Sequence, residues 1–187
     1  MPCLSEPDQR ALLELARKTI QDGVLRRKLP DAIPREGVFS ERRGVFVTLH
    51  VRGRLQGCIG VTEPNESLGE AVARCAVGAA MEDPRFAPMK AHQLDDMSIE
   101  ISLLSPLEPI LSEAIEVGRH GLLVVSHAHR GLLLPKVATE HRLTREQFLE
   151  ETCRKAGLPR EAWKDPGTRL FGFTCEVFSD PQASGKN

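Results

Sequence analysis

The stretch VFVTLHVRGRLQGCIGV, residues 45–61, contains two runs of alternating apolar and polar residues around a glycine-containing turn. Alternation of this kind over four to eight residues is typical of half-buried strands, so the stretch predicts an antiparallel β-hairpin. If Val51 pairs with Leu55, then Leu49 lies opposite Gly57 and one face of the hairpin is wholly apolar. A shift of one residue would mix the two faces, and burial of one face opposes such mixing.

In this register Cys58 lies on the more polar face, opposite Thr48 and diagonal to His50. Gly57 and Gly60 flank the cysteine closely on both sides. A glycine inside a strand costs stability, so it usually marks a bulge or the close approach of another group. The hairpin therefore holds a candidate site.

Three interpretations of Cys58 are open. It is a small buried apolar residue, as unpaired cysteines often are, or part of a binding surface with Gly57 and Gly60, or a nucleophile. A nucleophile needs help, because a thiol with an ordinary pKa of about 8.5 is only a few per cent thiolate at neutral pH. The candidate helpers in the sequence are His50, Arg52, Arg54, Arg85 and His120.

The rest of the chain mixes helical and strand patterns without regular β–α–β alternation, which predicts an α+β fold of antiparallel hairpins packed with helices. We expect a single domain over residues 5–178 and a frayed, disordered tail over 179–187. The expected elements are a helix from Ser5 to between Gly23 and Pro30, a capped helix over 67–81, a strand over 97–105, a short helix over 112–117, a hairpin of 122–126 with 131–134, a capped helix from Thr144 to Gly157, and a strand near 168–178.

Composition excludes several classes of function. The 187 residues carry a formal net charge of -1, which gives no general reason to expect binding to nucleic acid or to anionic membranes. Aromatic residues make up 4% of the chain, with no tyrosine, so base-stacking platforms are not indicated. No apolar run approaches the length of a membrane span, and the first residues do not resemble a signal segment.

The five cysteines are scattered, odd in number and free of any C-x-x-C spacing. This pattern argues against a disulfide framework and against a structural zinc site, so we expect no metal and a reducing, cytoplasmic location. His127 and His129 are spaced as a metal site would allow, but a surface turn is the better interpretation because the sequence offers no third ligand nearby.

Further candidates lie outside the hairpin. In the turn after the second helix, either Asp83 accepts backbone hydrogen bonds while Arg85 forms a structural ion pair, or Arg85 binds a carboxylate or phosphate with two N–H groups. His120 stands between Gly118-Arg119 and Gly121 ahead of an apolar strand, as a base or a donor. Glu100, on the polar side of its strand, either orients a base or meets solvent.

Taken together, several short motifs resemble the AMMECR-one domain family. The similarity runs from the first helix to about Phe178, and its motifs are specific only as a set. They are GCIG (57–60), DPRF (83–86), IEIS (99–102), GRHGL (118–122), GLLLP (131–135) and KAGLP (155–159).

The resemblance implies an α+β domain of two unequal lobes, with the cysteine hairpin beside a cleft. It also implies similarity to a bacterial protein that works with a radical S-adenosylmethionine protein and a Memo-type protein. The chain departs from the family at Gln56, where an arginine is usual, at Lys136, where glutamine is common, and at Leu143, where tryptophan is frequent. The first departure removes a cation that could hold an anion near Cys58.

Two functional hypotheses follow. In the first, a cleft lined by Gly57, Gly60, Gln56 and Arg85 binds a small anionic or nucleotide-like ligand, with Cys58, His120 and Glu100 as candidate catalytic residues of a thiol-dependent enzyme and no cofactor. In the second, the protein is a non-catalytic accessory protein that docks on a radical S-adenosylmethionine or Memo-type partner. Nucleic-acid binding ranks below both.

Overall fold

The computed structural model describes residues 4–26, 32–63 and 65–180. They form two compact units of unequal size: unit 1 combines the described residues of 1–104 and 176–187, and unit 2 comprises Ser105–Cys175. Each unit joins α-helices to a four-stranded sheet, and the strand pairs described within them are antiparallel. The α+β class predicted from the sequence is confirmed. The predicted cleft between two lobes stays a prediction.

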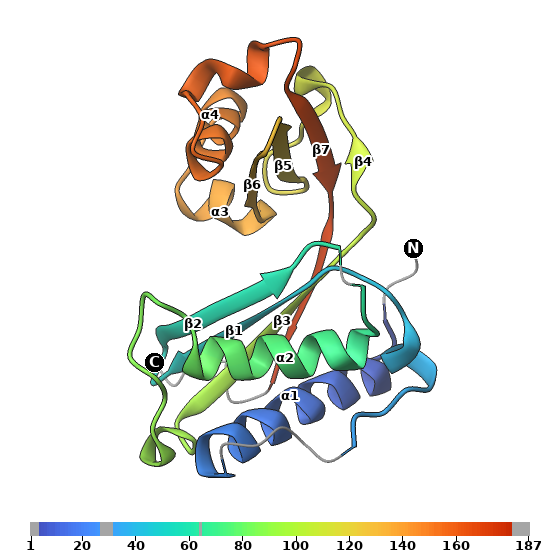
Figure 1. The fold of residues 1–187 in the computed structure, drawn as a ribbon, viewed down its shortest axis with the longest axis vertical. Coiled ribbons are helices and arrows are strands. Elements are labelled where there is room, and N and C mark those ends of the chain that lie inside the picture. Colours follow the sequence, from blue (N-terminus) through green and yellow to red (C-terminus); the bar gives the residue numbers. More distant parts are fainter. Residues whose placement is uncertain (1–3, 27–31, 64, 181–187) are drawn as a thin grey trace. The chain divides into compact units, whose positions relative to one another are not determined.

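Unit 1 is a sheet of order β2-β1-β3-β8 with two helices, α1 and α2, lying side by side on one of its faces (Figure 1). Strand β2 is therefore one edge of the sheet and β8 is the other. The bounds are α1 Glu6–Arg26, β1 Val45–Val51, β2 Arg54–Val61, α2 Leu68–Met81, β3 Met97–Leu104 and β8 Cys175–Ser179, with short 3-10 turns η1 at Gly37–Ser40 and η2 at Ala91–Gln93.

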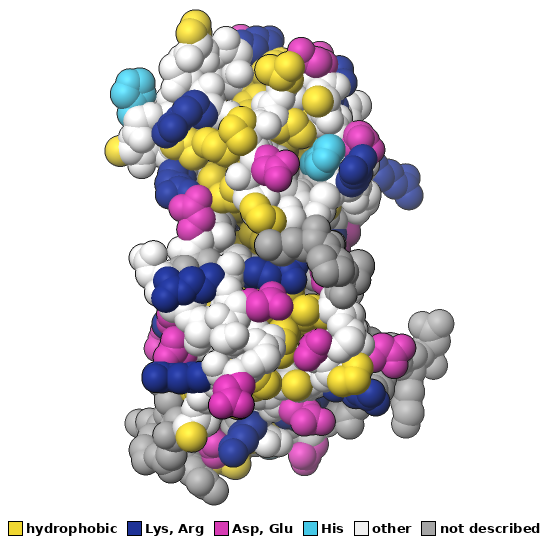
Figure 2. Space-filling view, turned by 90° about the vertical axis from the view of Figure 1, so that its right-hand side faces the viewer, with side chains coloured by type: hydrophobic (Ala, Val, Ile, Leu, Met, Phe, Trp, Pro, Cys, Tyr) yellow, Lys and Arg dark blue, Asp and Glu magenta, His cyan; other side chains and the backbone are white. Residues whose placement is uncertain are grey.

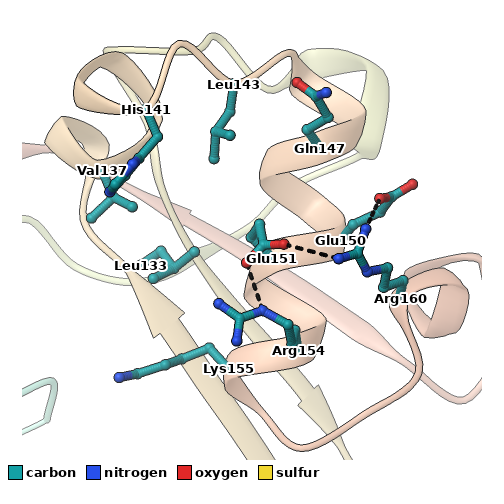
Figure 3. A pocket seen from close by; sticks show the side chains of 10 residues that line it. All are labelled: Leu133, Val137, His141, Leu143, Gln147, Glu150, Glu151, Arg154, Lys155 and Arg160. Atoms are coloured by element: carbon teal, nitrogen blue, oxygen red, sulfur yellow. Dashed lines mark hydrogen bonds and ion pairs between the residues drawn. The ribbon is translucent and has the colours of Figure 1, made fainter.

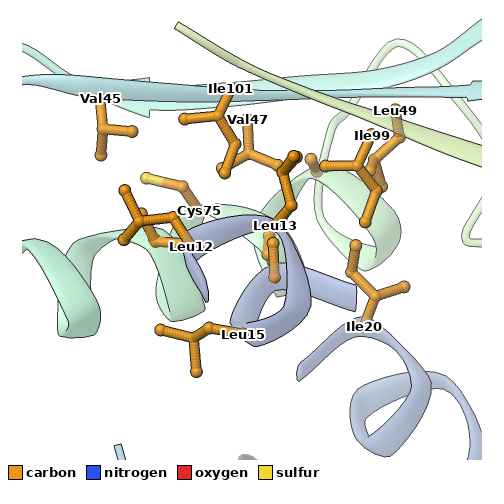
Figure 4. Packing of buried hydrophobic residues seen from close by; sticks show 14 of the residues in the cluster. Leu12, Leu13, Leu15, Ile20, Val45, Val47, Leu49, Cys75, Ile99 and Ile101 are labelled. Atoms are coloured by element: carbon orange, nitrogen blue, oxygen red, sulfur yellow. The ribbon is translucent and has the colours of Figure 1, made fainter. Parts of the chain in front are cut away.

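The core of unit 1 lies between the two helices and the sheet (Figure 4). Val45, Val47 and Leu49 of β1 are fully buried there. Burial of each such side chain stabilises the fold by about 1.5–3 kcal/mol, so a slip that exposed all three would cost about 4–9 kcal/mol. That cost is comparable with the whole stability of a typical domain, about 5–15 kcal/mol, which is why the apolar pattern fixes the strand register.

The hairpin register is confirmed from Val45, which pairs with Val61, to Leu49, which pairs with Gly57. Cys58 faces Thr48, as expected. The prediction is wrong at the turn, where Val51 pairs with Arg54 instead of Leu55.

The reason is a two-residue turn in which Arg52 and Gly53 have φ angles of 51° and 74°. Two-residue hairpin turns with both central residues at positive φ are favoured because they match the twist of the flanking strands. The turn therefore has two residues, where the sequence predicted three.

Helix α2 begins and ends as predicted. The Ser67 hydroxyl accepts a hydrogen bond from the Glu70 N–H (3.4 Å), and the Glu70 carboxylate accepts one from the Ser67 N–H (3.1 Å), so both halves of the capping box are present. The Ser67 hydroxyl (2.9 Å) and the Ser67 backbone N–H both donate to the Glu70 carboxylate and lower its pKa. The helix ends at Met81, just before the Asp83-Pro84 turn.

Unit 2 has a sheet of order β4-β7-β5-β6 and two helices, α3 and α4. Its largest buried side chains include Phe148 and Leu149 of α4 and Leu122 of β5. The bounds are β4 Glu108–Pro109, β5 Gly121–Ser126, β6 His129–Leu133, α3 Pro135–Glu140, α4 Arg145–Lys155 and β7 Arg169–Phe173, with 3-10 turns η3 at Ser112–Ala114 and η4 at Arg160–Lys164.

Most of the elements predicted for unit 2 are present with small changes. The second hairpin forms between β5 and β6, and the helix after Thr144 is confirmed together with its capping box. The short helix predicted over 112–117 is only the 3-10 turn η3. Helix α3 was not predicted, although Pro135 at its first turn is a known start signal.

The last predicted strand, 168–178, is two strands that belong to different sheets. The chain leaves β7 at Thr174, whose N–H donates to the Ser105 Oγ (3.0 Å), while its carbonyl accepts from the Ser105 N–H (2.9 Å). These bonds to the entering segment take the place of ladder pairing at Thr174. A continuous β pattern in sequence does not reveal such a break.

Of the predicted tail, 181–187 lie outside the described residues. Ser179 ends β8, and the Asp180 N–H donates to the carbonyl of Ile99 (3.1 Å) while its carboxylate forms an ion pair with Arg17. Within the described part of the chain, no helix combines the length and apolar character needed to cross a bilayer.

Candidate functional site

Cys58 lies on the edge strand β2, on the face of the sheet that does not carry the helices. The Thr48 hydroxyl of the neighbouring strand donates a hydrogen bond to the Cys58 Sγ (3.2 Å). The cysteine is half-buried, so of the three open interpretations full burial in the core does not hold. The structure leaves a binding surface and a nucleophile as the two remaining roles.

Gln56 is the extra residue of a β-bulge. Leu49 pairs with Gly57 and His50 with Leu55, so Gln56 has no partner on β1. Its side-chain amide instead donates to the carbonyl of Ala87 (2.8 Å), which ties β2 to the segment that follows the Asp83 turn. Bulges bend a strand and re-aim neighbouring side chains, and here the bend comes two residues before the cysteine.

The buried carboxylate of Asp83 holds the backbone of Cys58. Asp83 has a side chain that is 2% exposed, and its Oδ2 accepts a hydrogen bond from the Cys58 N–H (2.9 Å). Arg85 donates to the same carboxylate from its own N–H (3.1 Å), from Nε (3.0 Å) and from Nη2 (2.7 Å). These bonds, above all those from the Arg85 side chain, hold the pKa of Asp83 well below its usual range.

Together Asp83 and Arg85 cover part of the open edge of β2. The carboxylate satisfies the outward N–H of Cys58, and Arg85 Nη2 lies 3.4 Å from the Cys58 carbonyl oxygen. An uncovered edge strand offers unpaired backbone groups to other chains, and natural proteins block such edges with charged side chains. The structural interpretation of the Asp83-Pro84-Arg85-Phe86 turn is therefore well supported.

The guanidinium of Arg85 nevertheless remains accessible. Its side chain is 56% exposed and lies over the Phe86 ring, 5.3 Å from its centre. The hydrogen bonds to Asp83 raise the pKa of Arg85, so the group stays charged. The buried carboxylate, the aromatic ring and the β2 edge fix the orientation of an exposed cation next to Cys58.

The two glycines around Cys58 have close neighbours within unit 1. A Cβ built on Gly57 would lie 1.9 Å from the Ala79 carbonyl oxygen of α2, and one built on Gly60 would lie 2.3 Å from the Phe46 ring. Helix packing on one face and the aromatic ring on the other thus account for both glycines. Their predicted contact with a ligand stays a prediction.

Glu100 lies in the same cross-strand row as Cys58. Thr48 of β1 pairs with Cys58 of β2 on one side and with Glu100 of β3 on the other. Two strand spacings separate the cysteine from the glutamate, roughly 10 Å between backbones, with the Thr48 hydroxyl between them.

His120 belongs to unit 2, in the segment before β5. Its Nδ1 accepts a hydrogen bond from the Glu116 N–H (3.0 Å). Because a backbone N–H can only donate, the neutral ring must carry its proton on Nε2. His120 thus has a donor at Nε2 and an Nδ1 already engaged. The structure gathers Gln56, Cys58 and Arg85 in unit 1, with Glu100 two strands away, and places His120 in the other unit.

The two histidines of the β5–β6 turn have separate partners. The Nδ1 of His127 lies 3.4 Å from the Ser126 hydroxyl, and that of His129 lies 3.2 Å from the Ala156 carbonyl oxygen. No group of three or more metal-binding side chains is found among the residues that the structure describes.

The other described cysteines differ from Cys58 in their surroundings. Burial raises the pKa of Cys75 in the unit 1 core to about 11 and that of Cys175 to about 12, and it also raises the pKa of Cys153. Cys75 and Cys153 are fully buried. These three thiols therefore remain protonated near neutral pH.

The structure also reveals a pocket in unit 2 that the sequence did not predict. It has a volume of about 460 Å³ and lies among β6, α3 and α4 (Figure 3). Its lining combines apolar side chains such as Leu133 and Leu143 with charged residues of α4. Helical periodicity predicted α4 but not which of its exposed residues would face another element, so no signal in the sequence marked the pocket.

Charge is mixed on the described residues of the face that Figure 2 shows. On the face seen in Figure 2, lysine and arginine side chains are interspersed with aspartate and glutamate, with no continuous basic stripe. That face gives no support to the low-ranked hypothesis of nucleic-acid binding.

Comparison with known proteins agrees with the motifs. The AMMECR1 family model matches residues 13–178. A protein of Methanothermobacter thermautotrophicus is 44% identical, with 95% of this chain and 96% of that protein covered, and one of Methanosarcina acetivorans is 38% identical, with 98% and 96% covered. The crystal structure of the uncharacterized protein PH0010 from Pyrococcus horikoshii is similar with a TM-score of 0.89 and 36% identity, covering 98% of this chain and 96% of that one. The chain therefore belongs to the AMMECR1 family.

Proposed function

We propose that the surface of unit 1 around Cys58 and Arg85 binds a small anionic ligand, of which a nucleotide-like compound is one example. The observation that carries this proposal is the oriented and 56% exposed guanidinium of Arg85 beside the strand of a half-buried thiol. Under it, Cys58 contacts the ligand or attacks it as a nucleophile in a thiol-dependent enzyme. The reducing, cytoplasmic location predicted from the cysteines belongs to the same proposal.

The guanidinium geometry supports anion binding. Asp83 occupies the Nε–Nη2 side of Arg85 and fixes its plane. Nη2 also lies 3.4 Å from the Cys58 carbonyl oxygen, so Nη1 is the nitrogen placed to donate hydrogen bonds to a carboxylate or phosphate. An anchored arginine also loses less side-chain entropy on binding than a free one.

The remaining predicted site residues take defined parts in this proposal. The Thr48 hydroxyl orients the Cys58 sulfur, and Glu100 lies in line with both across the sheet. His120 belongs to unit 2, where its engaged Nδ1 leaves Nε2 as the donor, and it is not part of the proposed surface of unit 1. Gly57, Gly60 and the bulged Gln56 would shape the backbone next to the ligand.

Paired alkylating reagents test the proposal on the whole protein. The thiolate displaces iodide from iodoacetate and from iodoacetamide by the same reaction, but only iodoacetate is negatively charged. The ratio of the two alkylation rates at Cys58 therefore measures how strongly the surrounding surface attracts an anion. Modification is followed by mass spectrometry of the peptide that contains Cys58. The variants are Arg85→Gln and Arg85→Lys, with Arg74→Gln as control, because Arg74 of α2 is 51% exposed and also forms an ion pair.

We expect Arg85→Gln to lower the iodoacetate-to-iodoacetamide ratio by about two- to fivefold, since an exposed charge contact is worth up to about 1 kcal/mol. Arg85→Lys should keep part of the ratio, and Arg74→Gln should leave it unchanged. An iodoacetate-to-iodoacetamide ratio that is the same in the wild type and in Arg85→Gln would refute anion binding at this surface. A Cys58 that reacts only after unfolding would exclude the nucleophile role.

A second candidate function is that of a non-catalytic accessory protein for a radical S-adenosylmethionine or Memo-type partner. Leu55, at the start of the edge strand β2 and three residues from Cys58, is 41% exposed. An exposed leucine on a strand edge next to a charged turn is a feature that a partner protein could cover.

Binding of a purified radical S-adenosylmethionine protein or Memo-type protein tests this second candidate. Leu55→Ser and Arg85→Ala should each weaken binding, whereas Leu25→Ser on α1, where Leu25 is 60% exposed, should not. If neither protein binds the wild-type chain at micromolar concentration, the candidate is rejected.

A further inference from the structure

We infer that the pocket of unit 2 binds a small amphipathic carboxylate, with its apolar chain against one wall and its carboxylate at Lys155 and Arg154. This inference concerns a second site and does not depend on the proposed function of unit 1. The pocket volume of about 460 Å³ lies within the range of about 300–1,000 Å³ that is typical of small-molecule sites.

One wall of the pocket is apolar. Leu133 at the end of β6, Val137 of α3 and Leu143 ahead of α4 are only partly buried and line the pocket together. Leu133 and Leu143 also pack against the core cluster of unit 2, so they are held in place from behind. An aliphatic or aromatic chain would complete the burial of these side chains.

The opposite wall is charged and comes from α4 and η4 (Figure 3). Arg160 lies 3.7 Å from both Glu150 and Glu151, and Arg154 Nε donates to Glu151 (2.7 Å). The two carboxylates on this wall are therefore already paired with arginines.

Lys155 supplies the surplus charge. Three cationic side chains, Arg154, Lys155 and Arg160, face two carboxylates in the lining, and Lys155 forms no ion pair or hydrogen bond with any residue that the structure describes. An ammonium beside an apolar wall suits a ligand with one negative end and an apolar body. A cationic or neutral amphiphile would leave that charge without a partner.

Arg154 can share the negative end of the ligand. Its side chain is 67% exposed, and only Nε is bound to Glu151. Its terminal nitrogens lie toward the Lys155 side of the pocket in Figure 3. Lysine and arginine together thus offer several N–H donors to one carboxylate.

The single tryptophan of the chain provides the readout. Trp163 packs in the same cluster as Leu133 and Leu143, and the chain contains no tyrosine. Its fluorescence should therefore respond when a ligand covers these leucines. Octanoate is the probe, hexanoate tests chain length, and octylammonium is the control of matched length and opposite charge.

We expect octanoate to cause a saturable change in Trp163 fluorescence and to bind more tightly than hexanoate by about fourfold per added CH₂. Octylammonium should bind far more weakly. Lys155→Gln should weaken octanoate binding by about two- to fivefold, and Lys155→Glu should weaken it further. The control is Arg119→Gln, outside the lining and paired with Glu116.

Any of three results would overturn the inference. They are no saturable fluorescence change up to millimolar octanoate, octylammonium binding as tightly as octanoate, or an octanoate affinity that is the same in the wild type and in both Lys155 variants. Both substituted positions are exposed, so loss of folding does not confuse the outcome. Because Cys58 and Arg85 belong to unit 1, failure here leaves the alkylation test of the proposed function unaffected.

Discussion

The carboxylate of Asp83 accepts a hydrogen bond from the backbone N–H of Cys58, although 25 residues separate them in sequence. This contact joins the turn after α2 to the edge strand that carries the candidate thiol. It makes the position of the cysteine depend on an ion pair, since the same carboxylate holds Arg85.

The first prediction concerns this carboxylate. Asp83→Asn should destabilise the protein by about 1–3 kcal/mol at pH 7, because the buried carboxylate no longer accepts its charged hydrogen bonds. Water can replace the lost partner of Arg85 only in part, since the arginine side chain is only half-exposed. Urea unfolding measures the change. Asp96→Asn, which breaks the more exposed pair with Arg52, should cost at most about 1 kcal/mol.

The same variant has a defined pH dependence. The folded pKa of Asp83 is lower than the unfolded value of about 3.9, so its stabilisation is present above that value and is lost as the pH falls below it. The stability gap between wild type and Asp83→Asn should therefore narrow between pH 5 and the acid limit of folding. A gap that stays constant would contradict the assigned role.

The second prediction tests the contact between β2 and α2. Gly57→Ala should destabilise unit 1 by about 1–3 kcal/mol or more, because the new methyl group would overlap the Ala79 carbonyl oxygen of α2. Gly167→Ala is the control, since its Cβ would meet nothing closer than 3.9 Å. Equal melting temperatures for the two variants would show that the strand and helix separate easily.

The third prediction concerns alkaline pH. Burial raises the pKa of Cys75 to about 11, whereas an unfolded cysteine ionises near 8.5. The contribution of the protonated Cys75 thiol to the free energy of unfolding is complete below the unfolded pKa and is lost as the pH rises toward the folded pKa. The loss amounts to about 2 kcal/mol at pH 10. Cys75→Ala should therefore lose less stability between pH 8 and pH 10 than the wild type, as measured by urea unfolding at each pH.

The fourth prediction concerns the His120 ring. The neutral imidazole should carry its proton on Nε2, because Nδ1 accepts from the Glu116 N–H. Long-range proton–nitrogen NMR spectra distinguish the two tautomers directly. Finding the proton on Nδ1 would contradict the donor role given to His120.

Much of the fold could be predicted because local patterns encode it. The alternation in β1 placed Val45, Val47 and Leu49 in the core, and the Ser67–Glu70 and Thr144–Gln147 spacings located two helix starts. These signals depend on residues within a few positions of one another. The pairing of Cys58 with Thr48 followed from the same alternation.

The site could be predicted only in part, because its decisive contacts are non-local. The pattern marked Cys58, Asp83 and Arg85 but not that the Asp83 carboxylate connects the other two, and the bulge at Gln56 follows from a turn shorter than expected. The unit 2 pocket requires α3, which was not predicted, and it depends on tertiary packing that places α3 beside β6 and α4.

Ser105 and Thr174 are hydrogen-bonded to each other at the points where the chain enters and leaves unit 2. In sequence, unit 2 is therefore an insertion between β3 and β8, two strands of the first sheet. During synthesis on the ribosome, the first sheet cannot gain its fourth strand until the inserted segment has emerged. Unit 2, being continuous in sequence, can fold before that closing strand arrives. Maturation of the larger unit thus waits for the smaller one.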